Sequence, residues 1–128
     1  MSWQAVDSPK SFSYVVRDIA GDDIHSFTFN GDEGNVKVHY RIFRSQLPGP
    51  FVRVRVQFDE LEVKDDKEMG SGDWKIQTSV NNLNCANSPE EHWSIGSGSS
   101  ADLSAFRVVT VPADSTIVIR CRVWEEDS

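Results

Sequence analysis

Hydrophobic and polar residues alternate along most of the chain, as in β-strands that have one buried and one solvated face. The alternation is clearest in four segments, where apolar residues occupy every second position. Four other segments carry the same pattern more weakly. The clear segments are Val36–Ile42, Val52–Phe58, Trp74–Val80 and Ile117–Val123, and the weaker ones are Ser11–Val16, His25–Asn30, His92–Ile95 and Phe106–Val111.

Turn-forming residues separate these segments, so the sequence predicts an all-β fold. We expect one antiparallel β-sandwich of about eight strands, and a single domain that covers residues 1–128. The tetrapeptide Pro112–Ser115, between the last two strands, predicts a β-hairpin. Ser88, followed by Pro89, predicts at most one short helical turn with the serine as its N-cap.

One long segment, Phe51–Lys64, changes phase along its length. Its apolar positions are even-numbered as far as Phe58 and odd-numbered at Leu61 and Val63. A continuous strand can keep one face buried across such a slip only if it contains an extra residue. The sequence therefore predicts a β-bulge or a corner near Asp59–Glu60.

The composition fits a folded domain with excess negative charge. The chain has 128 residues, 38% of them hydrophobic, and a formal net charge of −7. Such a protein has no bulk attraction for nucleic acid, and no apolar run approaches the ~20 residues that span a bilayer. The N-terminal segment lacks the basic and apolar regions of a signal peptide, which favours a cytoplasmic location.

The two cysteines, Cys85 and Cys121, lie in different contexts. Cys121 falls on the apolar face of a strong strand pattern, and Cys85 lies in a polar segment. A domain of this length does not need a disulfide, so free thiols are favoured over a Cys85–Cys121 bridge. The two cysteines and three histidines show no short ligand spacing, so they predict no zinc site.

Two acidic segments are candidates for a cation site. The first follows a strand and contains four acids, and the second follows the last strand. Calcium requires six to eight oxygen ligands, which two such loops could supply together at one end of a sandwich. The alternative is that these are ordinary turn residues of an acidic protein. The predicted metal ligands are Asp65, Asp66, Glu68, Asp73, Glu125 and Asp127.

Over about half of the chain, these segments resemble the calcium-dependent phospholipid-binding sandwich, the C-two family. That family carries aspartates in two loops at one end of its sandwich. Asp66, Gly70 and the Gly72–Asp73–Trp74 box are similar to the first loop, and Val123 with Glu125–Asp127 is similar to the later loop. The resemblance implies calcium as the cofactor and a membrane headgroup as a partner.

Cationic residues occupy the outward positions of several strands. If those strands were neighbours, they would form a basic patch suited to an anionic ligand or an acidic partner. The alternative is that the cations cover exposed strand positions and pair with acids on adjacent strands. Trp124 shares a face with two of the arginines and could stack on a sugar or enter a membrane interface. The alternative, which we favour, is that it covers the edge of the core. The predicted ligand-binding residues are Arg53, Arg55, Arg120, Arg122 and Trp124.

The histidines carry no catalytic signature. His25, His39 and His92 stand without a nucleophile elbow or an oxyanion motif, and no phosphate-binding glycine loop precedes a helix. We therefore predict no catalytic residues and a non-enzymatic binding module, whose ligand is a membrane headgroup, a glycan or a protein surface. The alternatives are an assembly protein, which forms oligomers through its sheet edges and faces, and a small hydrolase.

Overall fold

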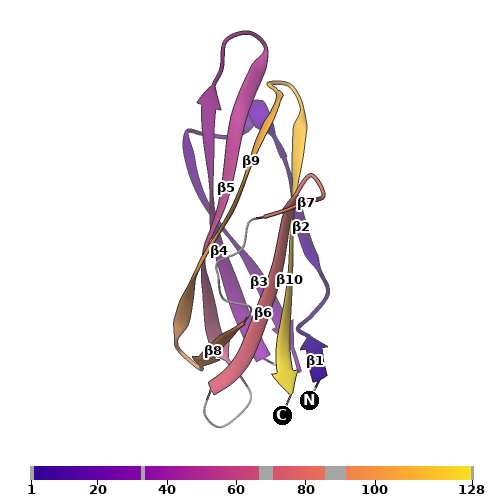
Figure 1. Ribbon diagram of the computed structural model, residues 1–128, viewed down its shortest axis with the longest axis vertical. Coiled ribbons are helices and arrows are strands. Elements are labelled where there is room, and N and C mark those ends of the chain that lie inside the picture. The colour runs from indigo at the N-terminus through magenta and orange to yellow at the C-terminus, as the bar shows by residue number, and fades with distance from the viewer. Residues whose placement is uncertain (1, 33, 67–70, 86–91, 128) are drawn as a thin grey trace.

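The computed structural model is an elongated β-sandwich whose strands run along its long axis (Figure 1). It describes residues 2–32, 34–66, 71–85 and 92–127, apart from the side chains of Ser2, Ser71 and Asp127. The strands are β1 (Ser2–Ala5), β2 (Lys10–Val15), β3 (Asp22–Gly31), β4 (Gly34–Gln46), β5 (Phe51–Asp65), β6 (Ser71–Val80), β7 (Leu83–Asn84), β8 (Trp93–Gly96), β9 (Ser100–Pro112) and β10 (Thr116–Asp127).

Two antiparallel sheets form the layers, which confirms the predicted fold class. Sheet A has the order β1-β10-β6-β7; β2 also pairs with β10, and β8 with β6. Sheet B has the order β3-β4-β5-β9. The eight expected segments all form strands, and the two additional strands, β1 and β7, are only four and two residues long.

The helical content of the described residues is one 3-10 turn at Val16–Asp18, which the sequence analysis did not predict. The turn predicted at Ser88 lies outside the described residues. Within those residues, no helix has the length and apolar character needed to cross a bilayer.

The predicted bulge in β5 is confirmed. The register of β5 against β9 shifts between Phe58 and Glu60, and the register of β4 against β5 shifts between His39 and Tyr40. Phe58, Leu61 and Val63 are consequently all buried, although they do not share one alternation phase. The bulge therefore keeps a 15-residue strand in the core along its whole length.

The hairpin predicted at Pro112–Ser115 is wrong in one respect. The turn is tight, with the Ser115 N–H donating to the Pro112 carbonyl at 3.1 Å. However, β9 belongs to sheet B and β10 to sheet A, so this turn carries the chain between the layers. The alternation pattern of two successive strands does not distinguish these arrangements, because both leave one face of each strand buried.

The core lies between the sheets and contains a series of aromatic rings. Tyr40 and Phe58 pack with ring centroids 5.4 Å apart, and Phe27 lies 4.9 Å from Tyr40. The hydroxyls of Tyr14 in sheet A and Tyr40 in sheet B are 2.6 Å apart and form the one hydrogen bond between core tyrosines. Trp74 is fully buried, as its strand phase predicted.

Both cysteines are free and buried, in agreement with the sequence analysis. Burial raises the pKa of the Cys121 thiol well above its ordinary value, and burial also raises the pKa of Cys85. Neither thiol is therefore activated as a nucleophile.

Candidate functional site

The two acidic segments meet at one end of sheet A. Asp73 at the start of β6 lies opposite Glu126 near the end of β10, and Trp74 lies opposite Glu125. Figure 1 shows this end of the sandwich, where the C-terminus lies beside β1. Antiparallel pairing places the first residues of β6 against the last residues of β10, so segments more than fifty positions apart become neighbours.

Two of the predicted metal ligands are buried at this end. Asp66 and Glu125 are 1% and 2% exposed. The Ser97 hydroxyl donates to Asp66 Oδ1 at 2.9 Å, and the Asp66 N–H donates to Ser97 Oγ at the same distance. Glu125 continues the inward-facing series of β10, and a Cβ atom on Gly72 would lie 3.3 Å from its Oε1. The glycine thus leaves room for the carboxylate beneath it.

The described part of this cluster does not form a multidentate cage. Asp65, Asp66, Asp73 and Glu125 do not bring three ligand atoms within 4.8 Å of one another in the described residues. Glu68 and the side chain of Asp127 lie outside the described residues. Calcium at this end therefore stays a prediction.

The described residues contain one such three-ligand group, on the outer face of sheet B. His39, Glu60 and Glu62 bring their ligand atoms within 4.8 Å of one another. The group is already hydrogen-bonded, because Glu62 contacts His39 Nε2 at 2.9 Å and accepts from Lys64 Nζ at 2.8 Å. These two contacts lower the pKa of Glu62 to about 2. The sequence analysis missed the group, since it depends on the pairing of β4 with β5.

The predicted ligand-binding arginines are divided between opposite faces of the molecule. Arg53 and Arg55 point outward from β5 in sheet B, whereas Arg120 and Arg122 point outward from β10 in sheet A. The sequence predicted a basic patch only for strands that are neighbours, and β5 and β10 belong to different sheets, so these two pairs of arginines do not form one patch. On sheet B, Arg41 pairs with an acid on the adjacent strand, which is the alternative that the sequence analysis gave for the outward cations. It forms a bidentate ion pair with Asp59 at 2.7 and 3.0 Å.

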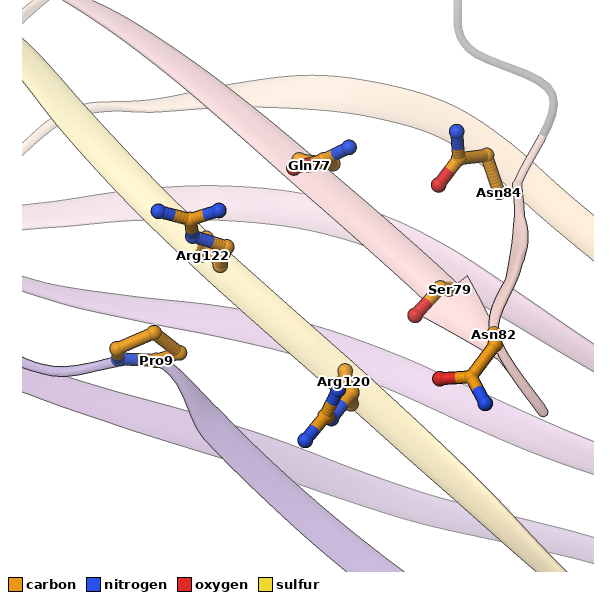
Figure 2. A pocket seen from close by; sticks show the side chains of 7 residues that line it. All are labelled: Pro9, Gln77, Ser79, Asn82, Asn84, Arg120 and Arg122. Atoms are coloured by element: carbon orange, nitrogen blue, oxygen red, sulfur yellow. The ribbon is translucent and has the colours of Figure 1, made fainter.

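Arg120 and Arg122 line a groove of about 320 Å³ on the outer face of sheet A (Figure 2). The register places Arg120 opposite Ser79 and Arg122 opposite Gln77 on β6. Figure 2 shows the two arginines side by side on β10, with Gln77 and Ser79 across from them. The lining residues are Pro9, Gln77, Ser79, Asn82, Asn84, Arg120 and Arg122.

A tight turn between β6 and β7 forms one wall of the groove. Asn81 and Asn82 both have positive φ, at 51° and 66°, as a two-residue type I′ hairpin requires. The Asn81 carboxamide oxygen accepts from the Val118 N–H, and the Asn81 N–H donates to the Val118 carbonyl, both at 2.9 Å. These bonds tie the turn to β10 and so fix Asn82 and Asn84 beside the arginines.

A row of tryptophans and cations continues the groove along the sheet. The Arg122 guanidinium lies 4.8 Å from the centre of the Trp124 ring, and Lys75 Nζ lies 5.2 Å from it. Lys75 is also 4.6 Å from the ring of Trp3. Trp124 is partly exposed, and these two cations lie over its ring.

No family model matches the chain, and neither a curated protein nor a solved structure matches it.

Proposed function

We propose that the protein is a non-enzymatic binding module that binds an anionic, hydroxyl-rich ligand in the groove of sheet A. The chemistry is that of an acidic sugar or a sugar phosphate. The observation that carries the proposal is the pairing of Arg120 and Arg122 with four amide and hydroxyl side chains around one groove. Of the predicted ligand-binding residues, Arg120 and Arg122 would contact the ligand, and Trp124 would lie beside them.

The charge of the groove supports an anionic ligand. Among the residues that the structure describes, no carboxylate lines it, although the chain carries a net charge of −7. Within the described residues, no ion pair involves Arg120 or Arg122. Two guanidinium groups two residues apart on one strand are therefore available to one phosphate, sulfate or carboxylate, through charge-assisted hydrogen bonds.

The polar lining supports a ligand that carries several hydroxyls. Gln77, Asn82 and Asn84 each offer a donor and an acceptor, and the Ser79 hydroxyl offers both. Hydroxyl groups act in the same two ways, so each sugar hydroxyl finds a partner of either kind. The groove volume is at the lower end of the range for small-molecule sites, which fits one or two sugar rings.

Trp124, beside the groove, positions Arg122 and does not act as a stacking platform for the ligand. Lys75 and Arg122 both lie over the Trp124 ring, so part of its π surface is occupied by cations of the protein itself. The contact restricts Arg122 before any ligand arrives, and such restriction lowers the entropy lost on binding.

The experiment is calorimetric titration of the protein with a sulfated disaccharide and with the same disaccharide without sulfate. We expect heat of binding only for the sulfated sugar, with an affinity that falls as salt rises. The variant Arg120→Gln/Arg122→Gln should lose that binding at least tenfold. Vesicles that carry a phosphorylated inositol lipid then distinguish a membrane headgroup from a free sugar as the source of the anion.

The matched control is Arg53→Gln/Arg55→Gln, which removes the same charge from the outer face of sheet B. It should bind the sulfated disaccharide as the wild type does. Equal losses in both double variants would mean that net charge alone drives the binding. No binding of any anionic sugar or vesicle would overturn the proposal.

We propose calcium as a second candidate ligand, at the acidic end of the sandwich. The support is the register, which brings Asp73 and Glu126 together beside the buried Glu125. Calcium there would neutralise carboxylates that repel one another, and the resemblance to the C-two family leads to the same expectation.

A further inference from the structure

Strand β3 forms one edge of sheet B. It is ten residues long, and its only partner strand among the described residues is β4. The β3–β4 pairing has no register shift from Asp22 to Gly31. The other side of β3 is therefore a long, regular row of backbone groups.

Two hydrogen bonds show which residues of β3 direct their backbone groups to that open side. The Arg44 N–H donates to the Gly21 carbonyl at 3.3 Å, so odd-numbered residues here bond to β4. The Asn30 N–H instead donates to Asp7 Oδ2 at 3.1 Å, away from β4. Because antiparallel ladders alternate, the N–H and C=O groups of Ile24, Ser26 and Thr28 point to the open edge. Within the described residues they have no hydrogen-bond partner there.

Apart from Asp22 and Asp23 at its start and the Asp7 contact at Asn30, the edge of β3 lacks the features by which proteins usually block strand addition. It contains no proline, no lysine, no bulge and no residue with positive φ. The edge strand on the other side of sheet B, β9, is interrupted by Pro112, by Ser104 with φ of 55°, and by a register shift. Strand addition is therefore open at β3 and hindered at β9.

A groove of mixed polar and aromatic lining lies beside the open edge. It measures about 320 Å³ and lies between β2 and β3. One lining residue, Phe12, is 51% exposed and stacks on Phe27 with ring centroids 5.2 Å apart. Ile24 is 78% exposed, more than any other large hydrophobic residue described. A strand added to β3 would cover these apolar groups.

We propose that β3 pairs antiparallel with β3 of a second copy of the chain, centred on Ser26. In this register Ile24 lies opposite Thr28 of the second copy, and Ser26 lies opposite Ser26. All these residues present edge-facing backbone groups, so the strand is self-complementary. Three such residue pairs give about six backbone hydrogen bonds.

The charges favour the second copy and this register. Asp22 of each copy faces Asn30 of the other, and no acid of one β3 faces an acid of the other β3. Asp7, whose Oδ2 accepts from the Asn30 N–H, is paired with Lys10 Nζ at 3.1 Å. A shift of the centre to Phe27 would place Asp22 opposite Asp32, where like charges destabilise the pair. The contact area of one strand is small, so the dimer is weak and forms only at high protein concentration.

Sedimentation equilibrium across micromolar to millimolar protein tests the dimer. We expect the apparent mass to rise toward that of two chains. Ile24→Lys places a charge on the edge, and Ser26→Pro removes an edge-facing N–H that β4 does not use, so each should remain monomeric. The control Thr110→Pro removes the equivalent N–H on β9 and should dimerise normally. Melting curves verify that each variant is folded.

A covalent test fixes the register. Cα atoms of a hydrogen-bonded antiparallel pair lie ~5.5 Å apart, within the range that a disulfide bridges. Ser26→Cys should therefore give a disulfide-linked dimer on mild oxidation, and Thr110→Cys should not. A monomer at every concentration, or a dimer that persists in folded Ile24→Lys and Ser26→Pro, would overturn the proposal. The anion-binding variants leave this result unchanged, so the two proposals fail independently.

Discussion

Asp73 and Glu126 lie directly opposite each other on the paired strands β6 and β10. Both side chains are partly exposed, and they belong to the two acidic segments that the sequence singled out. Like charges at directly opposite positions destabilise a sheet. The pair is therefore either a small defect in stability or a position where a cation offsets the repulsion.

Without a cation, Asp73→Asn should stabilise the protein. Removal of one charge relieves the cross-strand repulsion, so the free energy of unfolding in chelator should rise by about 0.2–1 kcal/mol. Urea unfolding of the variant and the wild type measures this change. Asp114→Asn, in the exposed turn between β9 and β10 where no strand residue lies opposite, is the matched control and should change stability less. A loss of stability in Asp73→Asn would show that the carboxylate has a structural partner.

With calcium, the wild type should melt at a higher temperature. A ligand that binds only the folded state raises stability as its concentration rises. We expect this increase in millimolar calcium, its reversal by chelator, and its loss in Asp73→Asn. The absence of any change in melting temperature or heat up to millimolar calcium would exclude calcium at this end.

Trp124→Ala should weaken anion binding without abolishing it. The ring restricts Arg122, and a cation–π contact at a partly exposed site contributes about 0.5–1 kcal/mol, which corresponds to a two- to fivefold change in affinity. Calorimetry with the sulfated disaccharide measures this change. Trp93→Ala, a tryptophan packed against the core, controls for a general loss of stability. An unchanged affinity in Trp124→Ala would show that Arg122 does not need the ring.

Gly34→Ala should destabilise the fold severely. Gly34 has φ of 151°, and an added Cβ atom would lie 2.6 Å from the Asp65 carbonyl and 2.8 Å from the Trp74 ring. Backbone strain and overpacking together should lower the free energy of unfolding by more than about 2 kcal/mol. Gly21→Ala, where nothing lies within 4 Å, is the control and should change it by less than about 0.5 kcal/mol. Thermal unfolding of both variants tests the contrast.

Stability should fall in alkaline solution because of the tyrosine pair. Burial and the contact with Tyr14 raise the pKa of Tyr40 above its ordinary value of 10.0, and burial raises the pKa of Tyr14. The folded state therefore retains protons that the unfolded state releases above about pH 10. Stability from this source is complete below pH 10 and declines as pH rises further.

The variant Tyr40→Phe tests this assignment. At neutral pH it should lose about 1 kcal/mol, because the Tyr14 hydroxyl loses its partner. Above pH 10 its stability should decline less steeply than that of the wild type, measured by urea unfolding at successive pH values. The buried cysteines also contribute to the alkaline decline in both proteins. Equal slopes would show that the pKa of Tyr40 is the same in the folded and unfolded states.

Local pattern was sufficient to predict most of the strands. The alternation predicted eight of them, the phase change in Phe51–Lys64 predicted the bulge, and the apolar phase of Trp74 predicted its burial. The strands that the sequence did not indicate, β1 and β7, are too short to show alternation. Their positions depend on pairing with β10 and β6.

The candidate sites depended on pairing that the sequence does not specify. Arg53 and Arg120 have equivalent local patterns, yet they lie on opposite faces because β5 and β10 belong to different sheets. The proximity of Asp73 to Glu126 was only a hypothesis until the register was known. Asn82 and Asn84 show no signal in the sequence beyond turn chemistry, and they line the groove because Asn81 is bonded to β10.

The sequence by itself determined that this chain forms strands with one buried face, and where β5 changes phase. Those properties follow from the two-residue period of a β-strand, which is local. The sequence did not determine the strand ends, since β9 begins at Ser100 and not at the predicted Phe106. Only the tertiary structure decided which strands are neighbours, which face carries the anion groove, and that β3 is left with an open edge. Those properties depend on contacts between residues far apart in the chain, and a strand's own side-chain pattern is the same whichever strand lies beside it.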